Sequence, residues 1–273
     1  MTQTDSVPSI AEAAATGEIA DLYADIRATL GTSVVNLIWR NLATLPGALR
    51  WTWSTVRPLY VGAAAPHAEA VRRALSLPNV PPFSTEVLMA AGIDAPAQTG
   101  IRTILDSYHH TNALALVVLS ALLQRYHPGD GEIAPPSETI SEIDKTELPA
   151  LPAMSALPPE VQRLIAELNQ FGEDTDPQLI ASMYRHLAYW PPYLALARTM
   201  LAPLQADGRL NALTRAARAL GRAHGRALVS ELAPSDPPPS LEAALGSCKL
   251  FVEHPIARMT GICALIRQVT PES

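Results

Sequence analysis

Apolar residues recur at intervals of three and four positions along most of the chain. One such run consists of Ile19, Leu22, Tyr23, Ile26 and Leu30, and another of Val161, Leu164, Ile165 and Leu168. This spacing places the apolar side chains on one face of an α-helix. The same pattern predicts helices over residues 66–77, 84–91, 96–126, 211–232, 240–245 and 248–268. No stretch alternates between apolar and polar residues with period two, so we predict an all-α fold with little or no sheet.

One sequence segment, with an arginine as its second residue, occurs twice. Residues 39–49 read WRNLATLPGAL and residues 184–194 read YRHLAYWPPYL, so the offset from Arg40 to Arg185 is 145 residues. The same offset aligns residues 105–122 with residues 250–267. Proline lacks a backbone donor and clashes with the preceding turn, so we expect a helix to end or kink at Pro46 and at Pro191. Such a repeat predicts a pseudo-dimer of two tandem helical repeats, with a cleft at the seam that both halves line.

The repeat divides the chain into four segments. Residues 1–15 are expected to be a disordered N-terminus, and residues 16–127 form the first helical repeat. Residues 128–159 are rich in proline and lack helical periodicity, which is typical of an extended, semi-rigid linker that crosses the surface. Residues 160–270 form the second helical repeat.

Composition and charge narrow the classes of protein to consider. The 273 residues are 48% hydrophobic and carry a net charge of −6, and the absence of a Lys/Arg cluster argues against a nucleic-acid partner. The longest apolar run, residues 113–123, is too short to cross a membrane, and Asp5 and Glu12 stand where a signal peptide carries cations. We therefore expect a soluble, cytoplasmic protein without a membrane partner. Cys248 and Cys263 are expected to be reduced core residues.

Motifs that bind cofactors or metals are missing from the sequence. It contains no GxGxxG, GxxxxGKS/T, HExxH or GxSxG motif, so we expect neither a cofactor nor a metal. What remains is a set of polar residues within apolar helices, where an unpaired polar group is costly. In the helix predicted from residue 96, Tyr108, His109 and Asn112 share a face.

In the second copy of the repeated segment, around Arg185, Ser182 and His186 share a face and Met183 lies beside them. Their counterparts in the first half are Leu37 and Asn41. We expect His109 and Asn112 on one side of the seam, and Ser182 and His186 on the other, to line a single pocket between the repeats.

Each of these residues also has a structural interpretation. A histidine of a helical protein, here His109, His110 or His186, is often a surface group or a core group with satisfied hydrogen bonds. Arg40 and Arg185 are expected to make structural hydrogen bonds at equivalent places in the two halves. The tryptophans are expected in the core or at an interface, with the alternative that Trp190 lines the pocket; they are Trp39, Trp51, Trp53 and Trp190.

Several sequence motifs resemble those of one enzyme family. Residues 17–19 read GEI, residues 23–30 match YxDIRxTL, and residues 40–47 match RxLATxPG. Asn112, the pair WP at 190–191 with Leu194, and LAP at 201–203 continue the match in order through most of the chain. The sequence resembles the group I 2-haloacid dehalogenases, the DehI family, whose members act on both D and L substrates. The resemblance implies an all-helical pseudo-dimer, distantly similar to the AhpD-like superfamily, whose redox cysteine pair this sequence lacks.

The resemblance also implies a catalytic site, in which this sequence departs from the family. An aspartate activates a water that displaces halide from the α-carbon with inversion, and an asparagine positions that water. The asparagine matches Asn112, whereas the aspartate falls on Met183, whose thioether cannot accept a proton from water near neutral pH. A tryptophan and a phenylalanine that line the family's pocket are replaced by Val34, or its neighbour, and by Leu37.

Three hypotheses about function follow. The first is an enzyme with a different catalytic set, in which Asn112 acts with His109 or His186, because imidazole titrates near neutrality. It would hydrolyse a halogenated or related small carboxylate, or carry out a proton-transfer lyase or cyclase step on a larger metabolite. The second is a non-catalytic binder of a small hydrophobic or carboxylate ligand, and the third is a scaffold; a homodimer is compatible with each. The candidate ligand-binding residues are Ser182, Met183, Tyr108, Trp190, Val34 and Leu37.

Overall fold

The computed structural model describes residues 7–140, 147–174, 179–233 and 235–272. Within these residues every regular element is a helix and no strand occurs, which confirms the predicted all-α fold. No helix in this part of the chain combines the length and apolar character that crossing a membrane requires.

In the first half of the chain, the described residues form six α-helices. The longest, α6, follows Asp94, whose side chain accepts a hydrogen bond of 2.9 Å from the backbone nitrogen of Ala97 and so caps its first turn. Gly31 ends the first helix in the left-handed conformation, with φ of 66°, which glycine adopts at little cost. The helices are α1 (Gly17–Leu30), α2 (Leu37–Leu42), α3 (Ala48–Val61), α4 (Ala64–Ala74), α5 (Thr85–Ala90) and α6 (Ala95–Tyr126).

The second half repeats much of this order. Both short helices, α2 and α8, have six residues, and their first residues are 145 positions apart. They end before Pro46 and Pro191, as predicted. This order supports the predicted repeat, although the superposition of the two halves remains a prediction. The helices are α7 (Pro159–Gln170), α8 (Ser182–Leu187), α9 (Pro191–Ala206), α10 (Arg209–Ala227), α11 (Leu241–Phe251) and α12 (Ala257–Val269).

Two helix boundaries differ from the prediction. The helix predicted over residues 211–232 ends at Ala227, with a short 3₁₀ turn at Val229–Glu231. The break predicted between residues 245 and 248 is absent, because a single glycine such as Gly246 weakens a packed helix by only about 1 kcal/mol. Instead, α11 continues into α12 through a π-helical turn, Val252–Ile256, which contains Pro255.

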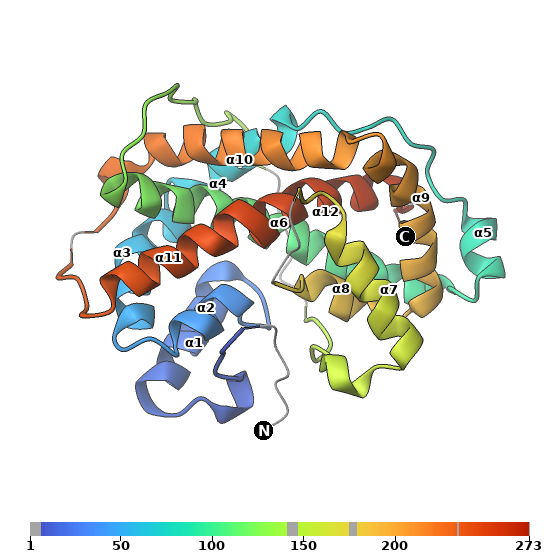
Figure 1. The fold of residues 1–273 in the computed structure, drawn as a ribbon, viewed down its shortest axis with the longest axis horizontal. Coiled ribbons are helices and arrows are strands. Elements are labelled where there is room, and N and C mark those ends of the chain that lie inside the picture. Colours follow the sequence, from blue (N-terminus) through green and yellow to red (C-terminus); the bar gives the residue numbers. More distant parts are fainter. Residues whose placement is uncertain (1–6, 141–146, 175–178, 234, 273) are drawn as a thin grey trace.

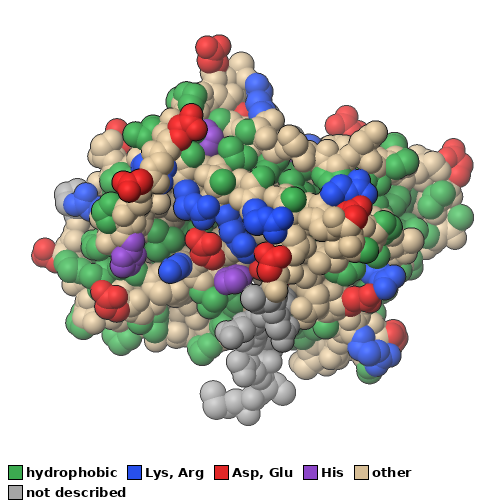
Figure 2. Space-filling view, turned by 45° about the horizontal axis from the view of Figure 1, so that its top comes forward, with side chains coloured by type: hydrophobic (Ala, Val, Ile, Leu, Met, Phe, Trp, Pro, Cys, Tyr) green, Lys and Arg blue, Asp and Glu red, His purple; other side chains and the backbone are tan. Residues whose placement is uncertain are grey.

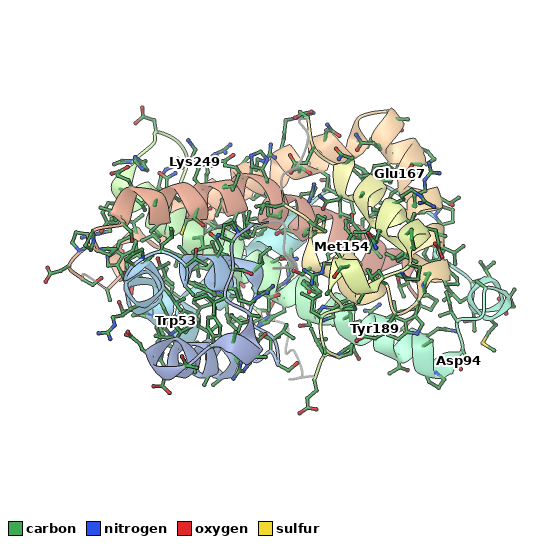
Figure 3. All side chains as sticks on the ribbon, turned by 60° about the horizontal axis from the view of Figure 1, so that its bottom comes forward. Trp53, Asp94, Met154, Glu167, Tyr189 and Lys249 are labelled. Carbon is green, nitrogen blue, oxygen red and sulfur yellow. The ribbon has the colours of Figure 1, made fainter. Side chains whose placement is uncertain are left out.

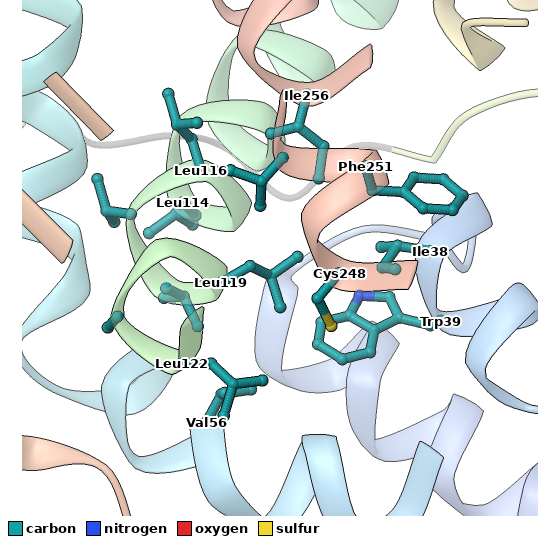
Figure 4. Packing of buried hydrophobic residues seen from close by; sticks show 14 of the residues in the cluster. Ile38, Trp39, Val56, Leu114, Leu116, Leu119, Leu122, Cys248, Phe251 and Ile256 are labelled. Carbon is teal, nitrogen blue, oxygen red and sulfur yellow. The ribbon is translucent and has the colours of Figure 1, made fainter. Parts of the chain in front are cut away.

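Two hydrophobic clusters share the central helices. In Figure 1, α1 to α3 lie on one side and α7 to α9 on the other, while α6 and α12 run between them. The N-terminal part of α6, with Ile101 and Leu105, belongs to the cluster that includes residues of α7 to α9. Its C-terminal part, with Leu116 and Leu119, belongs to the cluster of α1 to α3. Figure 4 shows this second cluster, in which Cys248 and Trp39 lie close to Leu119. One continuous helix therefore joins both cores.

Residues 7–15, expected to be disordered, are instead held against the first half. The Tyr23 hydroxyl donates to the carbonyl of Ile10 at 3.0 Å. Glu12 accepts hydrogen bonds from Arg27 at 2.7 Å and from the backbone nitrogen of Val35 at 2.8 Å. These part-buried polar contacts tie the segment to α1 and to the residues before α2, and the sequence did not reveal them because two involve backbone atoms. Residues 1–6 of the expected disordered segment lie outside the described residues.

Both cysteines are free and buried, as expected. Trp39, Trp51 and Trp53 are buried core residues, also as expected.

Candidate functional site

A small cavity of about 60 Å³ lies between the start of α2, the start of α8 and the middle of α6, and Phe251, Pro255, Ile256 and Met259 complete its wall. Two equivalent stretches, residues 36–38 and residues 181–183, both line it, so each half of the chain contributes the same part of its sequence. From α6 come Tyr108, Asn112 and Ala115, which are spaced by four and three residues and therefore share one face. The structure thus brings together five predicted site residues: Leu37, Tyr108, Asn112, Ser182 and Met183.

Asn112 presents an unused hydrogen-bond donor at this cavity. Its side chain is only 9% exposed, and within the described residues its buried Nδ2 atom has no hydrogen-bond partner. A buried amide without a partner costs about 1–3 kcal/mol, so an acceptor supplied by a ligand would recover that free energy.

Tyr108 and His186 form a buried hydrogen-bonded pair between the two halves. The Tyr108 hydroxyl lies 2.7 Å from His186 Nδ1, and His186 Nε2 lies 3.0 Å from the carbonyl oxygen of Pro149. Because a carbonyl oxygen can only accept, Nε2 carries the imidazole proton, and Nδ1 then accepts from the tyrosine. Burial lowers the pKa of His186 to about 4, against the smaller opposing effect of the Pro149 hydrogen bond. The imidazole is therefore neutral at pH 7.

The electrostatics of Tyr108 also favour its neutral form. Burial raises the pKa of this hydroxyl far above its ordinary value, and the positive charges of Arg185 and Arg40 oppose that increase only in part. Tyr108 at the cavity wall is thus a neutral hydroxyl that donates its proton in a hydrogen bond to His186 Nδ1.

A larger cavity of about 570 Å³ adjoins the first and shares Asn36, Tyr108 and Ser182 with it. His186, Val34, Arg40 and Arg185 line this second space, together with residues 148–151 and Ala153. The arginines also make the structural hydrogen bonds expected of them, Arg40 to the carbonyl of Val35 at 3.1 Å and Arg185 to that of Pro152.

The end of the predicted linker forms one wall of this larger cavity. Leu148 donates its backbone N–H to Ser33 Oγ at 2.8 Å, and the carbonyls of Ala150 and Pro152 each accept a hydrogen bond of 2.7 Å, from Tyr189 and Arg185 respectively. Figure 3 shows Met154 and Tyr189 on the side of the molecule that carries α7 and α8, opposite Trp53. The linker is therefore more than a spacer; residues 141–146 of it lie outside the described residues.

His109 and Trp190 do not line either cavity, so the single pocket expected to include His109 and His186 beside Asn112 does not form. His109 is one residue, or about 100°, away from Tyr108 around α6, and its electrostatic neighbours include Arg72 and Glu69 of α4. Burial lowers its pKa to about 3. Trp190 is half-buried and packs against Gly100, where an added Cβ would lie 2.9 Å from the indole ring.

Among the described residues, no acidic side chain lines the Asn112 cavity. Met183 is fully buried there. Glu12 lines the larger cavity, but its carboxylate is already bound by Arg27 and by the Val35 amide. In the described parts of the chain, no three His, Cys, Asp or Glu side chains come together in a way that could hold a metal ion.

Comparison with known proteins identifies the family. No family model matches the chain. A configuration-inverting 2-haloacid dehalogenase of Alcaligenes xylosoxydans xylosoxydans is 30% identical over 238 residues, which are 81% of this chain and 79% of the relative. This chain belongs to the configuration-inverting 2-haloacid dehalogenase family. A second member, from Pseudomonas sp. (strain 113), is 26% identical over 232 residues, covering 80% of this chain and 74% of the relative. The resemblance to the DehI family is thereby confirmed.

Solved dehalogenase structures share the fold. A D-2-haloacid dehalogenase mutant in complex with D-2-CPA matches with a TM-score of 0.69 and 20% identity over 97% of this chain and 94% of that one. A D-2-haloacid dehalogenase in complex with L-LA matches with a TM-score of 0.70, 20% identity and 96% coverage of both chains. At this identity the likeness establishes the helical dehalogenase fold.

Proposed function

We propose that this member of the dehalogenase family binds a small carboxylate in the Asn112 cavity and does not hydrolyse 2-haloacids by activating water with an aspartate. The observation that carries the proposal is the chemistry of the cavity wall. Met183 stands where the family resemblance puts the aspartate, and no other residue in the described part of the chain that lines the cavity is acidic. General-base catalysis contributes about 10²–10⁴-fold, so hydrolysis without a base is slow.

The donors at the cavity suit a carboxylate. The unpaired Nδ2 of Asn112 can donate to a carboxylate oxygen, and the hydroxyl of Ser182, which hydrogen-bonds to Tyr108, can rotate to donate to the same ligand. The guanidinium groups of Arg40 and Arg185 line the adjoining cavity and add positive charge nearby. Leu37, Ile38 and Met183 provide an apolar wall for a short alkyl group, and a volume of about 60 Å³ favours a ligand of few heavy atoms.

The Tyr108–His186 pair does not replace the missing aspartate in this proposal. The lone pair of His186 Nδ1 already accepts the Tyr108 proton, and burial lowers the pKa of His186 to about 4. A base of that pKa, separated from the Asn112 cavity by the tyrosine, is a poor acceptor for a proton from water.

One observation favours a second function, proton transfer on a larger metabolite. Tyr108 lines both cavities, and His186 lines the larger one. A ligand in the larger cavity could displace the Pro149 carbonyl from His186 and use the imidazole as an acid or base. In that case larger carboxylates would bind more tightly than C3 acids and would exchange α-protons with D₂O, whereas the first proposal expects no such exchange.

The first experiment measures chloride release from both enantiomers of 2-chloropropionate. We expect wild-type turnover at least 10²-fold below about 1 s⁻¹, the lower end of ordinary enzymes. Met183→Asp restores a carboxylate to the cavity and should raise chloride release, while Met183→Leu, of similar volume, should not. Ordinary turnover by the wild-type protein would refute the proposal.

The second experiment tests carboxylate binding by calorimetric titration with lactate and 2-chloropropionate. Asn112→Ala removes the unpaired donor and should weaken binding about tenfold or more, because hydrogen bonds to charged groups contribute about 1.5–3 kcal/mol. Met183→Leu serves as the control that leaves all polar groups in place. Equal affinities in the wild type and Asn112→Ala would remove the Asn112 cavity as the binding site.

A further inference from the structure

A third cavity, of about 230 Å³, lies at the C-terminal end of α6. Ser120, Gln124 and His127 line it from α6 and the residue that follows the helix, and Arg222 from α10. Lys249, Val252 and Glu253 complete the wall from the end of α11 and the π-helical turn. It shares no lining residue with the two cavities at the α2–α8 junction.

Ser120 gives this cavity a buried donor without a partner. The residue is 2% exposed, and within the described residues its Oγ atom has no hydrogen-bond partner. Close packing against Gly225 of α10 explains why the side chain is small, since a Cβ at Gly225 would lie 2.6 Å from Ser120 Cβ. Packing does not explain the hydroxyl, because an alanine at position 120 would fit the contact between α6 and α10 and would leave no unsatisfied buried group.

The charged groups at the cavity leave one positive charge in excess. Arg222 lies 3.8 Å from Glu253, so these two charges of the cavity wall offset each other; Arg218, 3.9 Å from the same carboxylate, also pairs with Glu173. Lys249 is exposed and forms no ion pair within the described part of the chain. Figure 3 shows Lys249 on α11, well away from Tyr189 and the cavities beside it. On the face shown in Figure 2, Lys and Arg side chains gather next to Asp, Glu and His side chains, so local charge balance decides where an anion can bind.

The π-helical turn Val252–Ile256 separates this cavity from the Asn112 cavity. Pro255 and Ile256 line the Asn112 cavity, while Val252 and Glu253 line the third cavity. Turns of this kind add a residue to the helix and occur frequently at functional sites. Here the wider turn directs residues of one segment toward two different cavities, the third cavity and the Asn112 cavity.

We propose that the third cavity is a second binding site for a small carboxylate, held by the Ser120 hydroxyl and the Lys249 ammonium. A monoanion balances the excess positive charge, and one of its oxygens satisfies the Ser120 donor. A volume of about 230 Å³ accommodates acetate or a C3 acid. The site is independent of the function proposed for the Asn112 cavity.

Titration of ¹⁵N-labelled protein with sodium acetate at constant ionic strength tests the site, because amide signals report which cavity is occupied. In the wild type we expect saturable shifts of the Ser120, Val252 and Glu253 amides. Lys249→Met and Ser120→Ala should each weaken this binding about tenfold, the effect of losing one charged hydrogen bond. Arg163→Met removes an exposed positive charge elsewhere and should leave the affinity unchanged.

Three results would overturn the proposal. The first is an absence of saturable shifts at these amides, and the second is equal acetate affinity in Lys249→Met, Ser120→Ala and the wild type. In the third, inorganic phosphate saturates the same signals while acetate does not, which would assign the site to phosphate. Repeating the titration in Asn112→Ala separates the two sites, because that variant should lose the Asn112 response and keep this one.

Discussion

Two hydrogen bonds fix the protonation state of His186. The carbonyl of Pro149 requires a proton on Nε2, and Tyr108 donates to Nδ1. This arrangement leaves no free lone pair on the imidazole, so a histidine that the sequence suggests as an acid or base is a neutral structural group. The polar residue that does remain available is Asn112, whose donor has no partner.

The Tyr108→Phe variant tests the value of this pair for stability. It leaves His186 Nδ1 buried without a donor, and we expect the free energy of unfolding to fall by about 1–3 kcal/mol. Tyr184→Phe is the matched control, because the Tyr184 hydroxyl is buried and has no hydrogen-bond partner among the described residues. Urea unfolding at pH 7 should show the loss in the first variant alone; equal losses in both would mean that the Tyr108–His186 hydrogen bond contributes nothing of its own.

At the scale of the helix, close contact between α6 and α10 sets how the two cores join. Gly221 and Gly225 are one turn apart on α10 and face Leu116 and Ser120 of α6. A Cβ at either glycine would come within 2.8 Å of α6 atoms, so the helices can approach this closely only because the side chains are absent. The same approach places Ser120 at the edge of the third cavity.

Gly225→Ala should therefore destabilise the fold. The new Cβ would lie 2.6 Å from Ser120 Cβ and 2.8 Å from the backbone nitrogen of Ala121. Because backbone atoms cannot move aside easily, we expect a loss of about 1–3 kcal/mol in the free energy of unfolding. Gly246→Ala, on α11 with nothing within 4 Å, should instead gain about 0.5–1 kcal/mol from helix propensity. If chemical denaturation gave both variants the same sign, tight packing of α6 on α10 would be ruled out as the cause.

The sequence predicts the helices and the seam better than the walls of the cavities. Apolar periodicity locates the long helices because their buried faces are made by side chains. On α6 it identifies Tyr108 and Asn112 correctly as neighbours, but His109 is a further 100° around the helix from Tyr108 and lines neither cavity. A spacing of three residues alone cannot decide whether a residue lies on the face of the helix that lines the cavity.

Residues 148–153 of the linker were not predictable as a cavity wall. Their contacts with Tyr189 and Arg185 use the carbonyls of Ala150 and Pro152. Backbone carbonyls are the same in every residue, so the sequence carries no signal for such contacts. The proline content correctly indicates an extended conformation and says nothing about where that segment lies.

For the whole molecule, burial of histidines links stability to pH. Burial lowers the pKa of His110, His186 and His224 to about 4 and that of His109 to about 3. His224 Nδ1 also lies 2.9 Å from His67 Nδ1 in the core, so at most one of these two atoms carries a proton. In the unfolded chain each of these groups titrates near pH 6.5. The unfolded state therefore binds more protons than the folded state between pH 6.5 and about 4.

We predict that the free energy of unfolding falls as pH decreases through this range. The full contribution of these histidines is present above pH 6.5, and it is lost as pH approaches their folded pKa values near 4. Urea denaturation at pH 7, 6 and 5 should give a slope equivalent to the uptake of roughly two to four protons on unfolding. His110→Asn should lower that slope by about one proton. A free energy of unfolding that stays constant from pH 7 to pH 5 would mean that these histidines are protonated in the folded protein, and the neutral Tyr108–His186 pair would then have to be abandoned as well.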